Sequence, residues 1–572
     1  MLVGSSRLGA LLAGLLATAT FAGTARYGFV YDDRPVVEAN PAAHDPTDWR
    51  AILLTPSWGG AAYRPLTVWT FAANHALHGP WPGGYHLTNV ALHAGAAALV
   101  VVVAARLGAP LAAATIAGVL FAVHPVHTEA VASIVGRAEI LCAIWVLLAL
   151  LAHARGGRAG WRWRDVAAVA GCVLAGLLSK EYAVTLVVLL PLLDLLVIDG
   201  GSRARFAAGL GTRRLAVYAV VALVAGGWLV ARHAIGRAAA LWPQPWMNPI
   251  AHAPVPERLL TALDVQARAA ALLAVPHPLR PDYSAETIPV IDDPASPRAL
   301  VGIGVALGLV ALGVALARRE TRALFWLLFA AATWSVVSNL VVPSWVLFAE
   351  RLVYLPSAGA CVLAALAVGA LASRARWWVA PLLTAVIVTA WMPLAWRAQR
   401  VWRDERTLAQ AMVAASPQSA HAHHVLGRVY AKSGELDRAL VELERAIALD
   451  PAGTDALYDA ALVHRARGRY AEARRLLRRL VRQFPSYSPG AVALAATELD
   501  LGRPARALAV AEHAAWYATR SAELQVERAL ALDALGREDE ARAAFERALR
   551  LAPGMAAARR GLARLAVRTP AG

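Results

Sequence analysis

The sequence predicts an all-α protein in two parts, a polytopic transmembrane helical domain followed by a solenoid of helical repeats. The 572-residue chain is 58% hydrophobic and 17% charged, with a mean hydropathy of +0.49. Soluble globular proteins are about 45–50% apolar and about 25% charged. The apolar residues form long runs within residues 1–395, and the charged remainder of the chain repeats with a period of 34 residues.

The apolar runs predict a transmembrane domain over residues 1–395. A spanning helix needs about 20 mostly apolar residues, and about eleven segments meet this requirement. They start near residues 7, 87, 111, 138, 166, 182, 215, 299, 323, 356 and 378. The first segment could also be a signal peptide, because Arg7 precedes it. Its apolar run continues to Val30 and many spans follow, which favours an uncleaved anchor.

Arginine placement predicts the orientation of these spans. Four connections between spans are rich in arginine, and all lie on the cytoplasmic side if the N-terminus does: 155–164, 203–214, 318–322 and 374–376. The C-terminal repeats and four loops then lie on the non-cytoplasmic side: 26–86, 124–137, 235–298 and 342–355. The arginine- and alanine-rich composition is typical of a prokaryotic chain, so we expect an inner or plasma membrane.

The strongly basic balance does not indicate a nucleic-acid partner. The net charge is +17 and the pI about 10.5, values that can accompany nucleic-acid binding. However, the basic residues of the first 395 positions lie mainly in short loops between apolar runs, which is a topology signal. The lipid bilayer is therefore the partner that the composition predicts.

A 34-residue lattice defines the C-terminal part. Glycine recurs on it at four positions, alanine at four and proline at four: Gly434, Gly468, Gly502, Gly536; Ala439, Ala473, Ala507, Ala541; Pro417, Pro451, Pro485, Pro553. This period is typical of the tetratricopeptide repeat, in which glycine allows the turn, alanine the close helix contact, and proline ends the unit. We predict a linker at 396–417, then about four repeats and a capping helix over 418–567. Such solenoids bind a protein partner, although an arm that only fixes assembly explains the pattern equally well.

Five groups of ionisable residues border the predicted spans, all on the outer face. Charge at membrane depth is costly and marks functional candidates. The groups are Asp32-Asp33; Arg64 with His86; His124, His127 and Glu129 with Arg137 and Glu139; Lys180-Glu181; and Glu350-Arg351 with Tyr354.

Each group has a chemical and a structural interpretation. Paired carboxylates can act as a general base or bind a divalent cation, and arginine or lysine can hold a phosphate. The two histidines with Glu129 could be metal ligands, but their spacing matches no metalloprotease motif. Solvated loop charges, snorkelling arginines, helix caps and internal ion pairs explain the same residues without function. Metal dependence stays open on the sequence.

Seven motifs, in order along nearly the whole chain, resemble the transmembrane and tetratricopeptide-repeat O-mannosyltransferase-like family of the C-type glycosyltransferase superfamily. They are Val30–Asp33, Tyr63–Thr67, Gly84–Asn89, Phe121–Glu139, Leu178–Glu181, Pro281–Ser284 and Ala349–Gly359. The specificity lies in their order and in the repeats that follow, since none is decisive alone.

The resemblance implies an enzyme that transfers a sugar, typically mannose, from a polyprenyl-phosphate donor to a protein Ser/Thr hydroxyl on the non-cytoplasmic face. By similarity, Asp33 or Asp32 would be the catalytic base and Glu129 a second acidic group. The chemistry adds cations for the leaving phosphate, for which the candidates are Arg351, Lys180, Arg64 and Arg137. Further site candidates are His127, His86, Glu139 and Tyr354.

Two other functions stay open on the sequence. A non-catalytic membrane scaffold or assembly factor would bind protein partners through its repeats and need no outer base. A transporter or flippase would need ionisable groups deep in the membrane, whereas these groups lie at span ends.

Overall fold

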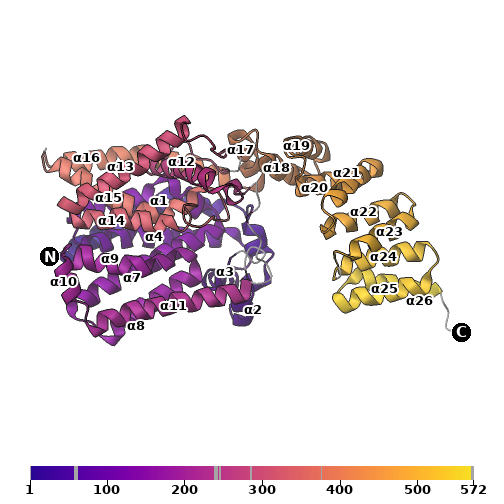
Figure 1. The fold of residues 1–572 in the computed structure, drawn as a ribbon, viewed down its shortest axis with the longest axis horizontal. Coiled ribbons are helices and arrows are strands. Elements are labelled where there is room, and N and C mark those ends of the chain that lie inside the picture. Colours follow the sequence, from indigo (N-terminus) through magenta and orange to yellow (C-terminus); the bar gives the residue numbers. More distant parts are fainter. Residues whose placement is uncertain are drawn as a thin grey trace. The chain divides into compact units, whose positions relative to one another are not determined.

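The structure, a computed structural model, consists of two compact helical units, residues 1–415 and 416–572 (Figure 1). It describes residues 2–56, 62–236, 243, 247–283, 286–374, 376–518 and 520–568. The predicted outer loops 26–86 and 235–298 are therefore described in part, and Ser284 of the sixth motif lies outside the described residues. Over the described ranges, the regular elements are all helical, as the sequence predicts.

The first unit is a bundle of long helices joined by short ones. Its α-helices are α1 (Leu2–Phe21), α2 (Trp49–Leu54), α3 (Pro65–His78), α4 (Pro82–Arg106), α5 (Leu111–Val123), α6 (Thr128–Ala132), α7 (Arg137–Ala159), α8 (Trp163–Ser179), α9 (Leu186–Leu193), α10 (Arg203–Ala208), α11 (Thr212–Gly236), α12 (Val255–Ala274), α13 (Pro297–Arg319), α14 (Thr321–Ser335), α15 (Tyr354–Ala372), α16 (Val379–Gln399) and α17 (Glu405–Ala415). Short 3-10 or π segments used below are η2 (Arg34–Glu38), η3 (Pro41–Ala43), η5 (Pro125–His127), η6 (Ile134–Gly136), η7 (Glu181–Thr185), η8 (Asp194–Ile198), η11 (Glu350–Val353) and η12 (Arg400–Trp402).

The chain is a multi-pass membrane protein, with fewer full-length spans than the sequence predicts. Within the described residues, eight helices are long and apolar enough to cross a membrane, and α5 with η5–α6 adds a ninth that is bent by 49°. The bend follows from Pro125, which cannot continue the helix of residues 111–123. All eleven predicted segments contain helix, but α8 has 17 residues and α14 has 15. At 1.5 Å per residue these two measure roughly 25 and 22 Å, less than the ~30 Å hydrocarbon layer.

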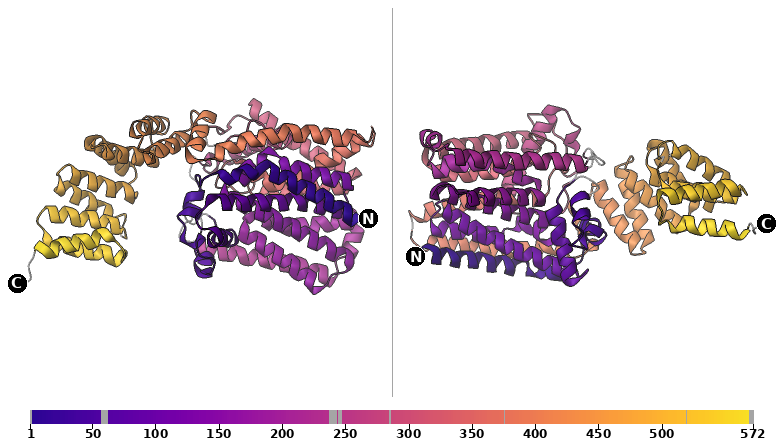
Figure 2. Two further views of the ribbon diagram at one scale, coloured as in Figure 1. Left: turned by 180° about the vertical axis from the view of Figure 1, so that it is seen from behind. Right: turned by 90° about the horizontal axis from the view of Figure 1, so that it is seen from below.

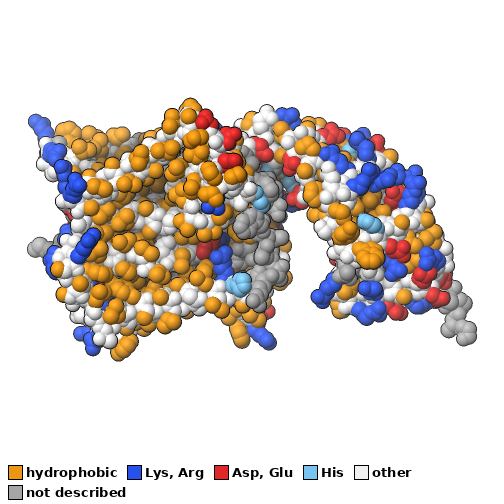
Figure 3. Space-filling view, viewed as in Figure 1, with side chains coloured by type: hydrophobic (Ala, Val, Ile, Leu, Met, Phe, Trp, Pro, Cys, Tyr) orange, Lys and Arg blue, Asp and Glu red, His pale blue; other side chains and the backbone are white. Residues whose placement is uncertain are grey.

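Three of the four arginine-rich connections, 155–164, 203–214 and 318–322, lie at one end of this bundle. Arg158 donates to the Arg106 carbonyl at 2.5 Å, and Arg322 donates to the Gly108 carbonyl at 3.3 Å. Thr321 donates to the Leu196 carbonyl at 2.8 Å, which adds the segment before α10 to the same end. Figures 1 and 2 show the N-terminus and α10 at this end and α2 and α3 at the other. Apolar side chains cover most of the face between the ends (Figure 3).

The segment predicted as a linker, 396–417, is largely helical and packs on the first unit. It holds the end of α16, then η12 and α17. The Arg403 carbonyl accepts a hydrogen bond from the Gly28 amide at 3.0 Å, and Glu405 pairs with Arg34 at 2.6 Å. The first unit therefore extends to Ala415, beyond the last apolar helix.

The second unit contains four helix pairs and a final helix, as the 34-residue lattice predicts. Its helices are α18 (Ala420–Lys432), α19 (Leu436–Leu449), α20 (Thr454–Ala466), α21 (Tyr470–Gln483), α22 (Ser488–Asp500), α23 (Pro504–Ala515), α24 (Ala522–Ala534), α25 (Glu538–Leu551) and α26 (Ala556–Arg568). The lattice glycines adopt φ of +68° to +78° in the turn inside each pair, a conformation that favours glycine. The lattice alanines are completely buried, which lets paired helices approach closely.

Candidate active site

Asp33 is a buried structural carboxylate at the base of the first outer loop. Its side chain is completely buried and accepts hydrogen bonds from the Val135 amide at 2.9 Å, the Val30 amide at 3.2 Å and the Ser133 hydroxyl at 3.4 Å. Burial raises the pKa of Asp33 to about 7, and the backbone amides oppose this rise. The carboxylate ties the loop to the segment before α7.

Asp32 lies next to Asp33 but in a different environment. Its side chain is half-buried, and it is close enough to Arg351 for the two charges to interact. The preceding Tyr31 has φ +47°, a left-handed conformation that costs a non-glycine residue free energy. This turn places the two adjacent carboxyl groups in unlike surroundings, and Asp32 is the one with solvent access.

Arg351 binds two carboxylates of the outer loops. Its backbone amide donates to Glu129 Oε2 at 2.9 Å, and its guanidinium pairs with Glu129 Oε1. Arg351 Nε lies 3.8 Å from Glu139 Oε1. The arginine side chain is 29% exposed while both carboxylates are almost buried. Arg351 therefore has a fixed position and an accessible edge.

Glu139 and Lys180 continue this chain of charges into the bundle. Lys180 Nζ pairs with Glu139 Oε1, and both side chains are nearly buried. Burial lowers the pKa of Lys180, and the charge of Glu139 opposes that effect. Lys180 is the residue directly after α8, and its side chain is enclosed by other side chains of the protein.

Arg64 and Glu181 form a second, more exposed ion pair. Arg64 Nη2 lies 2.9 Å and its Nε 3.3 Å from the two carboxylate oxygens of Glu181. The Thr67 hydroxyl donates to the Ser179 carbonyl at 3.1 Å, which holds the start of α3 beside the end of α8. Side-chain exposure is 13% for Arg64 and 25% for Glu181.

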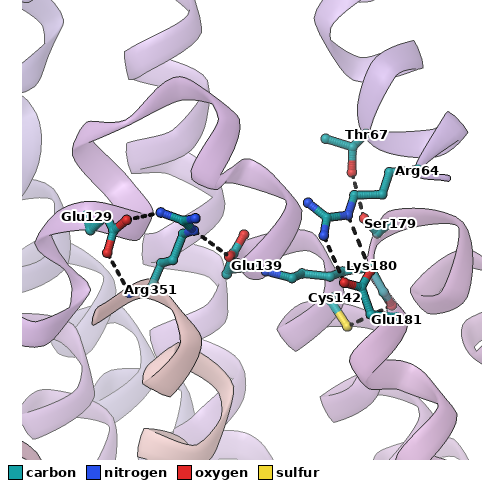
Figure 4. Close-up of polar contacts among 9 residues, drawn as sticks. All are labelled: Arg64, Thr67, Glu129, Glu139, Cys142, Ser179, Lys180, Glu181 and Arg351. Atoms are coloured by element: carbon teal, nitrogen blue, oxygen red, sulfur yellow. Dashed lines mark hydrogen bonds and ion pairs between the residues drawn. The ribbon is translucent and has the colours of Figure 1, made fainter. Parts of the chain in front are cut away.

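Figure 4 shows these residues as one alternating group of charges. We call it the charge ladder: Glu129, Arg351, Glu139, Lys180, Glu181 and Arg64. It draws on α6, η11, α7, η7 and the segments before α3 and η7. Three cations balance three carboxylates, so an incoming anion can be held only by sharing a cation that already has a partner.

Arg137 and His86 lie away from the ladder and support the fold. The Arg137 guanidinium is completely buried, donates to Asn89 Oδ1 at 2.8 Å and to the Tyr85 carbonyl at 2.9 Å, and lies over the Phe71 ring. His86 is also completely buried, with Nε2 3.4 Å from the Gly28 carbonyl. Both side chains are thus enclosed by other parts of the first unit.

His127 and Tyr354 belong to a buried aromatic cluster. The Tyr354 hydroxyl lies 2.7 Å from His93 Nδ1, and His127 Nε2 lies 2.8 Å from the Ser357 hydroxyl. The rings of His127 and Tyr354 are 4.6 Å apart. Both residues are completely buried, and their hydrogen-bond partners are His93 and Ser357 rather than residues of the ladder.

Glu350 and Tyr283 are site residues whose pairing the sequence did not predict. Instead of bracing Arg351, the buried Glu350 accepts from the Tyr283 hydroxyl at 2.8 Å and from the Arg280 amide at 2.5 Å. Burial raises the pKa of Tyr283, and the adjacent carboxylate adds to the rise. Tyr283 belongs to the motif Pro281–Ser284 of the family resemblance, and this motif is the one sequence signal that pointed to Tyr283. The contact fixes the loop after α12 against η11.

The described residues contain no group of three or more His, Cys, Asp or Glu side chains arranged to hold a metal ion. Of the two histidines in the third group, His124 has Nε2 3.2 Å from the Leu273 carbonyl oxygen, and His127 contacts the Ser357 hydroxyl. The His124 ring thus contacts α12 and the His127 ring contacts α15.

The repeats match known family descriptions. Residues 393–454, 424–488 and 458–523 match one tetratricopeptide repeat family, and residues 522–555 match another of the same description. Two solved structures resemble the chain: YrrB, described as a TPR protein with an unusual peptide-binding site (21% identity, TM-score 0.25, 28% of this chain and 82% of that one), and TTC0263, a TPR protein of Thermus thermophilus (28% identity, TM-score 0.24, 26% and 82%).

Longer stretches of the chain match proteins named as protein O-mannosyl-transferases. Protein O-mannosyl-transferase TMTC3 of Mus musculus is 31% identical over 369 residues, which cover 59% of this chain and 40% of that protein. Protein O-mannosyl-transferase Tmtc3 of Drosophila melanogaster is 27% identical over 540 residues (81% and 57%), and TMTC4 of Homo sapiens is 28% identical over 489 residues (75% and 65%). The chain is related to the protein O-mannosyl-transferases. The resemblance predicted from the motifs is thereby confirmed, and the matched region spans less than two thirds of each of these relatives.

Proposed function

We propose that this relative of the protein O-mannosyl-transferases is a membrane glycosyltransferase. It transfers a hexose, mannose by relationship, from a polyprenyl-phosphate donor to a protein Ser/Thr hydroxyl on the non-cytoplasmic face. The observation that carries the proposal is the position of the half-buried Asp32 within electrostatic range of Arg351, the most exposed cation of the charge ladder.

The reaction needs a base and a cation close together. The acceptor oxygen forms a bond to the anomeric carbon while the bond from that carbon to the phosphate oxygen breaks. Asp32 takes the hydroxyl proton, and the polyprenyl phosphate leaves with the bonding electron pair. Attack opposite the leaving group inverts the configuration at the sugar.

Arg351 and Arg64 are the groups that we assign to the donor phosphate. A guanidinium offers several N–H donors to phosphate oxygens, and both side chains keep an exposed edge. Glu129 and Glu139 then act as positioning residues, because they hold Arg351 in place. Lys180 stabilises Glu139 rather than touching the donor. Asp33 acts as the anchor of the loop, so the catalytic base is assigned to Asp32.

The test compares glycosylated exported peptides by mass spectrometry from cells that carry the wild-type chain, Asp32→Asn or Asp45→Asn. Asp45 is an exposed carboxylate of the same outer loop, and its side chain accepts hydrogen bonds from Thr47, so it controls for charge loss. Membrane expression is matched by quantitative blotting.

We expect Asp32→Asn to remove hexose-sized adducts from Ser/Thr peptides by at least about 100-fold, the usual range for a lost general base. Asp45→Asn is expected to keep them. Unchanged adducts in Asp32→Asn cells would reject the catalytic assignment and favour a repeat-bearing scaffold.

A further inference from the structure

The outer surface of the repeat unit carries a row of basic and aromatic side chains that the proposed reaction does not use. The 34-residue lattice places equivalent residues at the C-terminal ends of α21, α23 and α25. One lattice position holds Arg482, Trp516 and Arg550, and the position three residues earlier holds Arg479, His513 and Arg547. We call these six residues the basic row.

The three helices occupy equivalent places in consecutive repeats, with α22 and α24 packed between them. Val510 of α23 packs both against the core that contains Leu477 of α21 and against the core that contains Phe545 of α25. Val481 and Ala515, which directly precede Arg482 and Trp516, share another apolar cluster. Each lattice step therefore advances the row by one repeat of the stack.

The row is exposed and carries an excess of positive charge. Trp516 is 85% exposed, and Tyr517 beside it is 55% exposed. Arg482, Arg550, Arg547 and His513 are also exposed, whereas Arg479 is partly buried against the Pro451 carbonyl. The row itself contains no carboxylate. One helical turn earlier, the lattice holds Arg478, Glu512 and Glu546, and Glu512 has Arg528 as a partner at 3.6 Å. Figure 3 shows basic side chains gathered over α21.

We propose that the basic row docks on the headgroup layer of an anionic phospholipid bilayer. Arginine binds lipid phosphate, and an exposed indole between arginines is typical of a membrane interface. The repeat unit is covalently tethered to the membrane unit. Glu405 of α17 pairs with Arg34 of the first outer loop, and the repeat unit begins directly after α17. Tethering to a membrane protein gives the row a high local concentration of lipid.

The test places a fluorophore at the free end of the row. Ala448 is exposed and occupies the lattice position that precedes Arg482, so Ala448→Cys leaves the row intact. The labelled full chain is reconstituted in nanodiscs of phosphatidylcholine, with or without phosphatidylglycerol, that contain a lipid with a nitroxide on its headgroup. The same treatment of the chain without this substitution measures background from Cys142, Cys172 and Cys361.

We expect stronger quenching in phosphatidylglycerol discs, and we expect high salt to reverse it. Arg482→Gln with Arg550→Gln should lower the docking constant by about 25-fold, since each arginine near an anionic surface contributes a factor of about five. Trp516→Ser should weaken docking without changing its salt dependence. The matched control is Arg475→Gln with Arg506→Gln, which removes two exposed arginines from α21 and α23 outside the row.

Equal quenching in both kinds of disc would overturn the proposal. An equal loss in the control variant would do so as well, because it would reduce the effect to bulk charge. A fluorescence change on adding polyglutamate, without any lipid effect, would assign the row to an acidic protein instead. Activity is not a readout here, so the outcome is independent of the proposed reaction.

Discussion

Asp33 and Asp32 show how one residue step changes the chemistry of a carboxyl group. Asp33 is enclosed by the backbone of residues 133–135, which lies about a hundred positions away in the chain, as the Val135 bond shows. Asp32 is half-buried and close enough to Arg351 for the two charges to interact. The sequence could identify the pair as important, but nothing local distinguishes the two, because the enclosing segment is brought in only by the fold.

Burial of Asp33 is expected to make the first outer loop more stable in mild acid. The pKa of the folded carboxyl is about 7, above its ordinary value of 3.8, so the folded loop binds a proton more tightly than the unfolded loop. The stability that protonation provides is full below about pH 4 and lost as the pH rises through about 7.

Hydrogen exchange of residues 27–38, corrected for intrinsic rates, checks this expectation. Protection in the wild-type chain should increase as the pH falls from about 7 to about 5, while Asp33→Asn should show little change. A parallel increase in the variant would show that another group is responsible.

At the scale of elements, the bundle end opposite the charge ladder holds a second buried polar cluster. Asp194 in η8 accepts from the Tyr218 hydroxyl of α11 at 2.5 Å and lies 2.9 Å from His153 Nε2 of α7. Arg214 of α11 lies 3.4 Å from the same carboxylate. One carboxylate thus fixes three spans relative to one another.

Asp194→Ala is therefore expected to destabilise the membrane unit by about 2–4 kcal/mol, because it leaves the Tyr218 hydroxyl and His153 Nε2 without their acceptor. Arg214 keeps a second partner, Asp199, at 2.9 Å. Tyr218→Phe should cost only about 1 kcal/mol, the value of one hydrogen bond. Thermal unfolding of both variants in detergent checks the order, and equal shifts would contradict it. Glycosylation by the folded fraction should persist, since the ladder lies at the other end.

The positions of the membrane helices were predictable from the sequence, because long apolar runs mark them. Every predicted apolar segment contains helix, and Pro125 marks the bend in the third. The lengths of α8 and α14 were not predictable, because a short helix is tolerated only where neighbours cover its ends. The same limit applies to Arg137: its charge suggested a phosphate contact, but Asn89 and the ring of Phe71 enclose it.

At the scale of the whole molecule, each unit contains apolar clusters of its own. The apolar core of the first unit ends at Ala395, and the repeats form their own clusters. Leu477→Ala, in the repeat core, should therefore destabilise the repeats by about 2–5 kcal/mol and leave the spans unchanged.

The matched substitution is Leu189→Ala, which is equally buried in the membrane core. Urea unfolding followed by limited proteolysis and mass spectrometry distinguishes the units. We expect Leu477→Ala to lower only the midpoint of the repeats and Leu189→Ala only that of the spans. A common shift in both units would show that they unfold as one.

The attachment of α17 determines where the molecule can be divided. Glu405 of this helix holds Arg34, which lies two residues after Asp32, and the Ala415 carbonyl accepts from Arg280 in the loop that Glu350 fixes. Excision of the repeats at the end of α16 would leave both loops without these partners, although the cut would fall after the last apolar helix. The shortest N-terminal piece that keeps these contacts is therefore residues 1–415, in which α17 is retained as part of the first unit.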